Sequence, residues 1–360
     1  MATDIPSAGF KGRGALSNPH NRFDRQRTEG VDDGWHRDGP ESTIATVLSP
    51  DTTRSILSRN DSPDIPFDQS INPYRGCEHG CVFCYARPTH AYLGLSPGID
   101  FETKLMFKAD AATLLRAELA RPGYRCRHIM LGANTDPYQP VERRLGVTRA
   151  VLEVLAETRH PVAITTRSAL VERDIDLLAD MARDGLASVF LSITTFDPDL
   201  KRRLEPRAAS STARLAAMRA LSAAGIPVGV MAAPMIPAVN DSELEEILER
   251  SAEAGARRAG YSLLRLPHEV KDLFREWLRQ HMPDRAQHVM SLIQAARGGR
   301  DNDPGFGKRM TGTGAWAQLL ADRFRLAVKR LELCSDREAE LRTDLFRPPR
   351  EAAPQLELGL

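Results

Sequence analysis

Short β-branched runs alternate with helical patterns through the middle of this 360-residue chain. Apolar runs of 4–8 residues are typical of strands, whereas apolar residues three or four positions apart predict amphipathic helices. The predicted strands cover 71–74, 128–132, 162–166, 188–193, 227–232 and 261–265. The predicted helices between them cover 109–120, 148–158, 171–182, 211–223 and 242–253. This order favours a parallel sheet with right-handed crossovers, either open or closed into a barrel.

The two ends of the chain break this alternation. The first 65 residues are rich in Gly, Ser, Asn, Asp and Pro and predict an irregular segment laid over the core through Phe10, Leu16 and Phe23. The chain therefore divides into an irregular N-terminal segment (1–65), a barrel (66–268), a helical extension with a Gly-rich loop (269–334) and a flexible tail (335–360). The helices expected in the extension cover 270–278, 283–296 and 315–331.

Local signals mark several helix ends. Thr148 and Asp241 have side-chain oxygens that suit an N-cap, while Gly185, Gly225 and Gly255 follow the last positions of helical patterns. In parallel α/β folds the active site lies at the carboxyl ends of the strands. The segments that directly follow the predicted strands are therefore the places to look for chemistry.

Composition and charge exclude several classes of protein. Hydrophobic residues make up 42% and charged residues 27%, as in ordinary globular proteins. The longest apolar runs have about ten residues and a bilayer span needs roughly 20, so no membrane partner is expected. The start lacks the order of a signal peptide, which favours a cytoplasmic protein. With 49 basic and 48 acidic residues, any contact with nucleic acid has to depend on a local patch.

Three cysteines lie close together directly after the first predicted strand. The segment Cys77-Glu-His-Gly-Cys81-Val-Phe-Cys84 separates its thiols by three and two residues, and Gly76 and Gly80 give the backbone the freedom to wrap around one metal centre. Cysteine thiolates hold iron–sulfur clusters. Because a cubane has four corners, three ligands leave one iron open to a substrate or cofactor.

Two other interpretations of these cysteines stay open on spacing alone. A structural zinc site needs a fourth ligand. His79 lies inside the loop but is poorly placed, and Cys126 and Cys334 are far away in the sequence. Three buried, inert thiols are the remaining alternative. The density of cysteines favours the iron–sulfur cluster over both.

The cysteine segment resembles a known family. CxxxCxxC with an aromatic residue, Phe83, before the last cysteine resembles the cluster loop of the radical SAM superfamily. That superfamily has an α/β fold, a partial (βα)6 TIM-like barrel, which agrees with the predicted strands and helices. The wider context NPYRGCEHGCVFCYAR resembles the spore photoproduct lyase-like branch, also described as DNA repair photolyase-like. The resemblance covers roughly residues 68–266.

This resemblance implies a set of cofactors and a reaction. Cys77, Cys81 and Cys84 would ligate a [4Fe–4S] cluster, and S-adenosylmethionine (SAM) would bind its open iron through the amino and carboxylate groups. An electron from a flavodoxin- or ferredoxin-like donor would then cleave SAM to methionine and a 5′-deoxyadenosyl radical, which abstracts hydrogen from the substrate.

The resemblance also implies residues that bind SAM. After the second strand, Asn134, Thr135 and Asp136 have the acceptors that an ammonium group needs. The alternative for this segment is an Asx-type turn leading into the next proline. After the third strand, Arg167 would pair with the SAM carboxylate, unless it is only a solvated charge. Tyr85 belongs to the same set, although packing or hydrogen relay, a role shared with Tyr138, would also account for it.

Later strands supply the remaining SAM candidates. Ser192 and Thr194 alternate at the end of the fourth strand, so both would lie on the face that lines the barrel. Satisfying backbone groups is the alternative role for them. Glu205 and Arg207 resemble a Glu-x-Arg element of the lyase-like branch, and we expect an ion pair between them that orders the loop.

One position departs from the lyase-like branch. Spore photoproduct lyases have a hydrogen-donor cysteine where this chain has Ala133, and Cys126 lies near the other end of the same predicted strand. Since a strand rises about 3.3 Å per residue, the two are more than ~20 Å apart. Reversal of a thymine dimer by that hydrogen-donor scheme is therefore not expected. Cys334 has no assigned role and is expected to be a small buried hydrophobe.

Three segments bear on a nucleic-acid partner. The Gly-rich segment 298–314 contains three basic residues and would cover a phosphate backbone, cap the barrel as a lid, or merely connect helices. A basic set would neutralise phosphates or remain solvated; it comprises Arg121, Arg125, Arg127, Arg143 and Arg144. The C-terminal Gln355–Leu360 resembles the hexapeptide that docks on the bacterial sliding clamp.

Together these observations predict a radical SAM enzyme that acts on nucleic acid, with damaged or modified DNA as the favoured substrate. A radical SAM modifier of RNA, of a peptide or of a small molecule is the alternative among enzymes. A non-catalytic iron–sulfur or zinc adaptor that binds DNA or the sliding clamp is the alternative from another class.

Overall fold

The computed structural model describes residues 10–24, 44–335 and 341–349. Six parallel strands form most of a seven-stranded sheet in the order β10-β9-β8-β7-β6-β3-β2, so neighbours along the chain are neighbours in the sheet. The parallel strands are β3 (Gln69–Ile71), β6 (Ile129–Leu131), β7 (Val162–Thr166), β8 (Ala187–Ile193), β9 (Val228–Met235) and β10 (Arg258–Leu263). Antiparallel β2 (Leu57–Arg59) forms one edge. This topology confirms the partial (βα)6 barrel.

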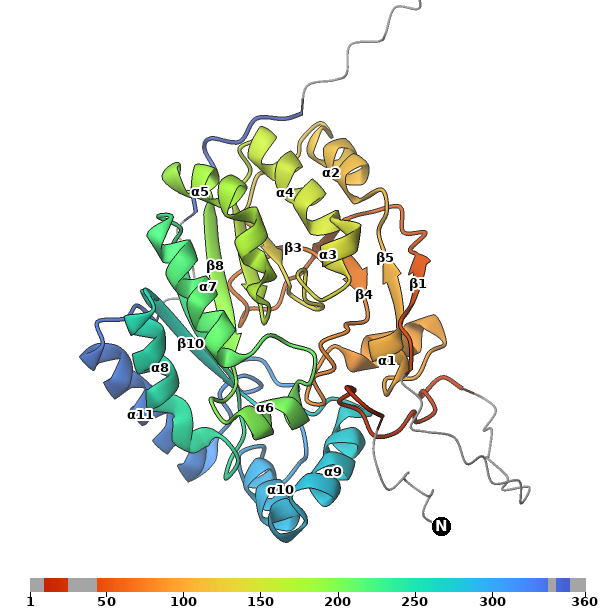
Figure 1. Ribbon diagram of the computed structural model, residues 1–360, viewed down its shortest axis with the longest axis vertical. Helices are drawn as coiled ribbons and strands as arrows, with labels where there is room; N and C mark the ends of the chain where they lie inside the picture. Colours follow the sequence, from red (N-terminus) through yellow and green to blue (C-terminus); the bar gives the residue numbers. More distant parts are fainter. Residues whose placement is uncertain (1–9, 25–43, 336–340, 350–360) are drawn as a thin grey trace, which may run out of the picture.

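Helices cover the outer face of this sheet (Figure 1). They are α2 (Ala111–Leu119), α4 (Val147–Glu157), α5 (Ile175–Arg183), α7 (Ser211–Ala223) and α8 (Leu244–Glu253). Each buries one apolar face, and in α4 this face includes Val151, Leu152 and Leu155. Every residue of β8 is buried because the strand is covered on both faces. The continuous apolar runs in the sequence have this cause.

The helix ends agree only in part with the sequence signals. Gly185, Gly225 and Gly255 have positive φ angles of 71°, 80° and 100°, so they end helices as predicted. Thr148 is not an N-cap, because it lies inside α4 and its hydroxyl donates to the Pro137 carbonyl at 2.6 Å. Asp241 accepts the indole N–H of Trp316 at 2.9 Å instead of capping its helix.

A second, smaller sheet supports the cysteine segment. It has three strands in the order β1 (Val47–Pro50), β5 (Lys104–Phe107) and β4 (Tyr74–Arg75). Short α1 (Asp100–Thr103) precedes β5. The N-terminal segment therefore contributes β1 and β2 and is less irregular than predicted. Leu16 is buried as expected, but Phe23 is 54% exposed and does not anchor the segment in the core.

The helical extension lies beyond β10. Helices α9 (Val270–His281) and α10 (Ala286–Ala295) group at one end of the molecule, and α11 (Gly314–Arg330) packs beside α8 (Figure 1). The remaining short helices are α3 (Glu142–Leu145), α6 (Pro198–Leu204), η1 (Arg87–Leu93), η2 (Ala169–Asp174), η3 (Asp241–Glu243) and η4 (Pro283–Arg285). None of the helices in the described residues has the length and apolar character that spanning a membrane requires.

Part of the predicted tail packs against the barrel. The backbone N–H groups of Arg342 and Arg347 donate to the carbonyls of Gly185 and Thr158, at 3.0 and 2.8 Å. The ring of Phe346 meets the edge of His160 at a centroid distance of 5.3 Å. Cys334, predicted to be buried, is exposed, because it lies in a bridge beside the outer strand β10. The candidate clamp peptide Gln355–Leu360 lies outside the described residues.

Candidate active site

A cavity of about 350 Å³ opens at the carboxyl ends of the parallel strands. All three clustered cysteines line it, together with residues that lie in the last part of β6, β7, β8, β9 and β10 or directly follow β6, β7 and β10. The other two cysteines of the chain, Cys126 and Cys334, are not among the lining residues. The cavity therefore lies where parallel α/β folds place their active sites.

The cysteine loop is held by hydrogen bonds between backbone and neighbouring segments. The N–H of Cys77 donates to the carbonyl of Phe101 at 2.9 Å, and the Arg87 guanidinium donates to the carbonyl of Cys81 at 2.9 Å. Gly76 and Gly80 have positive φ angles of 77° and 68°, which L side chains rarely adopt. Both glycines therefore adopt the left-handed backbone conformation that their predicted backbone freedom allows.

The N-terminal segment packs against this loop and is hydrogen-bonded to Glu102, which pairs with Arg87 of the same region. Glu102 accepts the backbone N–H groups of Gly14 and Ala15 at 3.0 and 2.9 Å and pairs with Arg87 at 2.5 Å, where both charged side chains are fully buried. A Cβ on Gly14 would lie only 1.7 Å from the carbonyl oxygen of Gly80, so no larger residue fits there. Sequence patterns gave no signal for this contact, because its partners are far apart in the chain.

The surroundings of the thiols favour a positively charged metal centre over free thiolates. Burial raises the pKa of Cys77, Cys81 and Cys84, so the thiolate forms need a positive group beside them. In the part of the chain that the structure describes, no three His, Cys, Asp or Glu side chains are arranged to hold a single metal ion. The residues present thus fit a [4Fe–4S] cluster and do not form the closed tetrahedral set of a structural zinc site.

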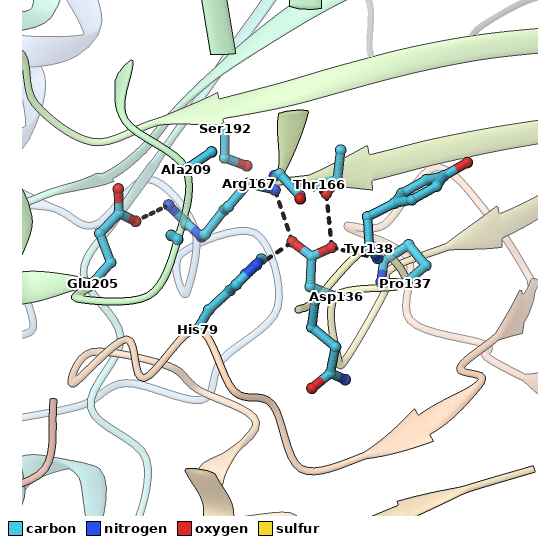
Figure 2. A network of polar contacts seen from close by, with 12 residues as sticks. His79, Asp136, Pro137, Tyr138, Thr166, Arg167, Ser192, Glu205 and Ala209 are labelled. Carbon is cyan, nitrogen blue, oxygen red and sulfur yellow. Dashed lines mark hydrogen bonds and ion pairs between the residues drawn. The ribbon is translucent and has the colours of Figure 1, made fainter. Parts of the chain in front are cut away.

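Asp136 lies at the centre of a polar network on the strand side of the cavity (Figure 2). Its carboxylate accepts hydrogen bonds from the Thr166 hydroxyl and the Arg167 backbone N–H, both at 2.7 Å, and from the Tyr138 N–H at 2.9 Å. His79 Nδ1 lies 3.3 Å away in a close electrostatic contact that lacks hydrogen-bond alignment. Burial alone would raise the pKa of Asp136, but His79 and these hydrogen bonds lower it overall.

Arg167 is tied into a second buried network on the same side. Its guanidinium contacts the Glu205 carboxylate at 3.0 Å (Figure 2). It also donates to the Thr194 hydroxyl and the Ala233 carbonyl, both at 2.9 Å. Glu205 also pairs with Arg214, and both of these side chains are fully buried. Burial alone would raise the pKa of Glu205, but Arg214 and Arg167 lower it. The expected pair between Glu205 and Arg207 is wrong, since Arg207 contacts Glu78 at 3.3 Å.

The structure brings five of the eight predicted SAM-binding residues into the cavity and leaves three outside. The lining residues are Tyr85, Asn134, Asp136, Arg167 and Ser192. Thr135 is buried and donates to the Tyr74 carbonyl at 2.7 Å. Thr194 follows the end of β8, so the strand alternation expected to place it beside Ser192 does not extend to it. Arg207 does not line the cavity.

The hydrogen-relay candidates differ in position. The Tyr138 side chain is buried behind the cavity and donates to Asp174 at 3.0 Å. Tyr85 lines the cavity, is 44% exposed, and its hydroxyl donates to the carbonyl of Ala133. Ala133 itself lines the cavity, so the place of the lyase cysteine carries only a methyl group. Of the two tyrosines, Tyr85 alone is a cavity residue.

The opposite side of the cavity was not predicted from the sequence. It includes Arg265, which follows β10, and Met310 of the Gly-rich segment. Asp64, from the loop between β2 and β3, pairs with Arg309 at 2.5 Å and accepts the Gly307 N–H at 3.1 Å. The Gly-rich segment therefore contacts the loop between β2 and β3 and contributes Met310 to one side of the cavity.

None of the five arginines predicted to neutralise phosphates lines the cavity. Arg143 and Arg144 are exposed on α3, which follows β6. Arg121, Arg125 and Arg127 are exposed and precede β6, at the end of the sheet opposite the cavity. Arg127 also pairs with Asp68 at 3.0 Å. These residues therefore do not continue the surface of the cavity.

Comparisons with known proteins agree with this geometry. A model of the radical SAM superfamily matches residues 71–251. An uncharacterized protein of Mycobacterium tuberculosis (strain ATCC 25618 / H37Rv) is 39% identical over 232 residues, which cover 64% of this chain and 68% of that protein. One from Methanocaldococcus jannaschii is 28% identical over 173 residues, 48% of this chain and 62% of its own length.

Solved structures show the same fold. Spore photoproduct lyase complexed with dinucleoside spore photoproduct has a TM-score of 0.56 at 18% identity, and the match covers 79% of each chain. A mutant of that enzyme with bound AdoMet and dinucleoside spore photoproduct also has a TM-score of 0.56, at 17% identity and the same coverage.

Proposed function

This chain belongs to the radical SAM superfamily, and we propose that it applies SAM-dependent radical chemistry to a nucleic-acid substrate. Its cofactors, as the family implies, are a [4Fe–4S] cluster and SAM. Cys77, Cys81 and Cys84 would hold the cluster at the cavity wall. When bound and reduced by an electron donor, these groups supply a 5′-deoxyadenosyl radical that abstracts hydrogen from the substrate.

The side chains around the thiols have separate tasks in this proposal. Asn134 and Ser192 offer polar groups to SAM from the ends of β6 and β8. Arg167 presents a cation to the SAM carboxylate, while Glu205 fixes the direction of its guanidinium. Asp136 holds β6 against β7 and keeps both strand ends in place. Thr135 and Thr194 stabilise the wall from behind.

One observation carries the choice of substrate: the cluster thiols and several aromatic rings line a single cavity. Phe67, Tyr85 and Phe190 belong to its surface, which is mostly apolar. Planar nucleobases stack on such rings. The dinucleoside lesion in the solved lyase supports testing DNA first. Because Ala133 replaces the lyase cysteine, we expect the hydrogen atom to return to the product by another route.

The test compares UV-irradiated and untreated oligothymidylate with the reconstituted enzyme. Formation of 5′-deoxyadenosine and the mass of the oligonucleotide are measured without oxygen. We expect the irradiated DNA to raise 5′-deoxyadenosine several-fold and to change mass. If neither DNA changes in mass while an RNA, peptide or metabolite mixture does, the enzyme acts on another substrate class. Salt-sensitive DNA affinity without any SAM cleavage would favour the adaptor.

A further inference from the structure

We propose that Arg265 is the residue that binds the phosphodiester of the substrate inside the active-site cavity. This inference rests on the proposed function, because it names the charged group of a nucleic-acid substrate that the cavity accepts. It concerns the side of the cavity formed by β10 and the Gly-rich segment, which the SAM-binding residues leave unused.

Arg265 lies at the carboxyl end of the last parallel strand, two residues after β10 ends at Leu263. Its guanidinium carbon is 5.1 Å from the centroid of the Tyr85 ring. Tyr85 directly follows the cluster ligand Cys84, so this cation faces the region where the reaction takes place. A group bound to Arg265 would thus extend from the cavity edge toward the cluster.

The Arg265 side chain is partly buried and lacks an anionic or oxygen partner. Its Nε is buried without a hydrogen-bond partner, and Nη1 has only a weak contact with the Met310 sulfur at 4.0 Å. Throughout the described ranges, no carboxylate lies within ion-pair distance of it. Asp64, the acidic residue on this side of the cavity, is already bound by Arg309 and the Gly307 N–H.

Two other arginines show that this lack is specific to Arg265. Arg167 lines the same cavity, but its guanidinium is bound to Glu205, Thr194 and a carbonyl. Arg297 is buried nearby and donates to the carbonyls of Lys308, Arg309 and Leu264 at 2.7–2.9 Å. Of these three, Arg265 alone makes no hydrogen bond to an oxygen acceptor of the described residues, so its guanidinium is available to a ligand.

The guanidinium of Arg265 determines which chemical group would bind to it. A guanidinium has a planar fork of N–H groups that matches the two oxygens of a phosphate. Burial and the charge of Arg309 lower the pKa of Arg265, and Tyr85 and Asp64 oppose this shift only in part, so a bound anion would favour the charged guanidinium. A base stacked on the neighbouring aromatic rings would carry its phosphodiester to this position. The carboxylate of SAM is the other oxyanion available, and the experiment separates the two.

The experiment measures the binding of two probes to reconstituted wild-type enzyme and to variants. One probe is the dinucleotide TpT, and the other is its uncharged methylphosphonate analogue. We expect wild type to bind TpT about tenfold more tightly, the worth of one charge-assisted hydrogen-bond pair. In Arg265→Gln this ratio falls to near one, and Arg265→Lys retains part of it. The control Arg183→Gln, at an exposed position of α5, keeps the wild-type ratio.

Two results would overturn the assignment. The first is a ratio in Arg265→Gln that equals wild type, or a wild type that does not distinguish the probes. The second is an Arg265→Gln variant whose SAM affinity falls while its probe ratio is unchanged, because Arg265 would then serve SAM. Iron content and circular dichroism verify that each variant is folded. Substrate-free 5′-deoxyadenosine is measured in parallel, so failure of the radical chemistry is visible separately from failure at Arg265.

Discussion

The two sides of the active-site cavity differ in how their charged side chains are paired. On the side of the cysteine loop and β6 to β8, Glu205 is buried, Asp136 and Arg167 are partly buried, and every one of them is paired or hydrogen-bonded. On the side of β10 and the Gly-rich segment, Arg265 has no carboxylate partner within the described residues. The ion pair nearby, Asp64 with Arg309, joins two distant segments of chain.

This difference indicates what each side binds. A fixed network costs desolvation but holds side chains in one geometry, which suits a cofactor that is the same in every turnover. A cation without an anionic partner, such as Arg265, suits a ligand that binds and is released in each turnover. The Gly-rich segment beside it is held by the ion pair between Asp64 and Arg309. We propose on this basis that the first side binds the cofactor and the second side binds the substrate, and the following experiments test that assignment.

The largest effect is expected on the cofactor side, at the thiols. Cys81→Ala should abolish stable cluster binding, because the remaining two cysteines cannot replace the third ligand. Iron and sulfide are measured after anaerobic reconstitution. Cys126→Ala is the matched control, since that thiol does not line the cavity, and it should load iron like wild type. Equal loading of both variants would remove Cys81 from the site.

The buried network predicts the next largest effect. Glu205→Gln leaves Arg167 and Arg214 buried without their counter-charge, which should lower the free energy of unfolding by about 3–5 kcal/mol. Urea unfolding of the cluster-free protein measures this. Asp199→Asn breaks an exposed pair with Arg202 and should cost less than about 1 kcal/mol. Similar losses in the two variants would contradict a difference between fixed and exposed pairs.

The free energy of unfolding should not change between pH 6.5 and about pH 5 because of the acidic groups on either side of the cavity. The pKa values of Asp136, Glu205 and Asp64 are all lowered overall, so their contributions persist above pH 5 and are lost only at lower pH. His160, at the other end of the barrel, behaves differently: burial lowers its pKa to about 4. Its unfolded pKa is about 6.5.

Below pH 6.5 the unfolded chain binds a proton at His160 that the folded chain does not. The free energy of unfolding should therefore fall by about 3 kcal/mol between pH 6.5 and 4. His160→Gln should remove this slope, and His288→Gln, at an exposed position, should leave it unchanged. Urea titrations at several pH values measure both. An unchanged slope in His160→Gln would assign the acid sensitivity to another group.

The smallest effect is expected at the ion pair between Asp64 and Arg309, which holds the Gly-rich segment against the loop between β2 and β3. Asp64→Asn weakens the pair with Arg309, so the Gly-rich segment should open more often, by a free energy of about 1 kcal/mol. Trypsin cleavage after Lys308 or Arg309 should then be about fivefold faster. Asp322→Asn, in an exposed pair on α11, is the control. Cleavage at the wild-type rate would show that this pair does not hold the segment closed.

The sequence predicted the barrel because its strands are short, buried runs separated by amphipathic helices. It also singled out the loop of three cysteines within eight residues, and the structure places all three in the wall of the cavity. Ion-pair partners were not predictable in the same way. Glu205 pairs with Arg214 and Arg167 rather than with Arg207, because the choice depends on which side chains the folded loops bring together.

The sequence did not predict the side of the cavity formed by β10 and the Gly-rich segment, for a related reason. Asp64 and Arg309 are 245 residues apart in the chain, and no local pattern indicates that they meet. Arg265 has an ordinary strand-end position in the sequence, and only the cavity reveals that its donors are unused. The docking of Phe346 against His160 likewise depends on a contact between the predicted tail and the barrel.

The most direct test of the account is the formation of 5′-deoxyadenosine by the reconstituted enzyme with SAM and a strong reductant, in the absence of oxygen. The account predicts this product from wild type and none above background from Cys81→Ala. It would be contradicted by a wild-type protein that contains a complete cluster and binds SAM, yet forms no more 5′-deoxyadenosine than the variant, with or without DNA.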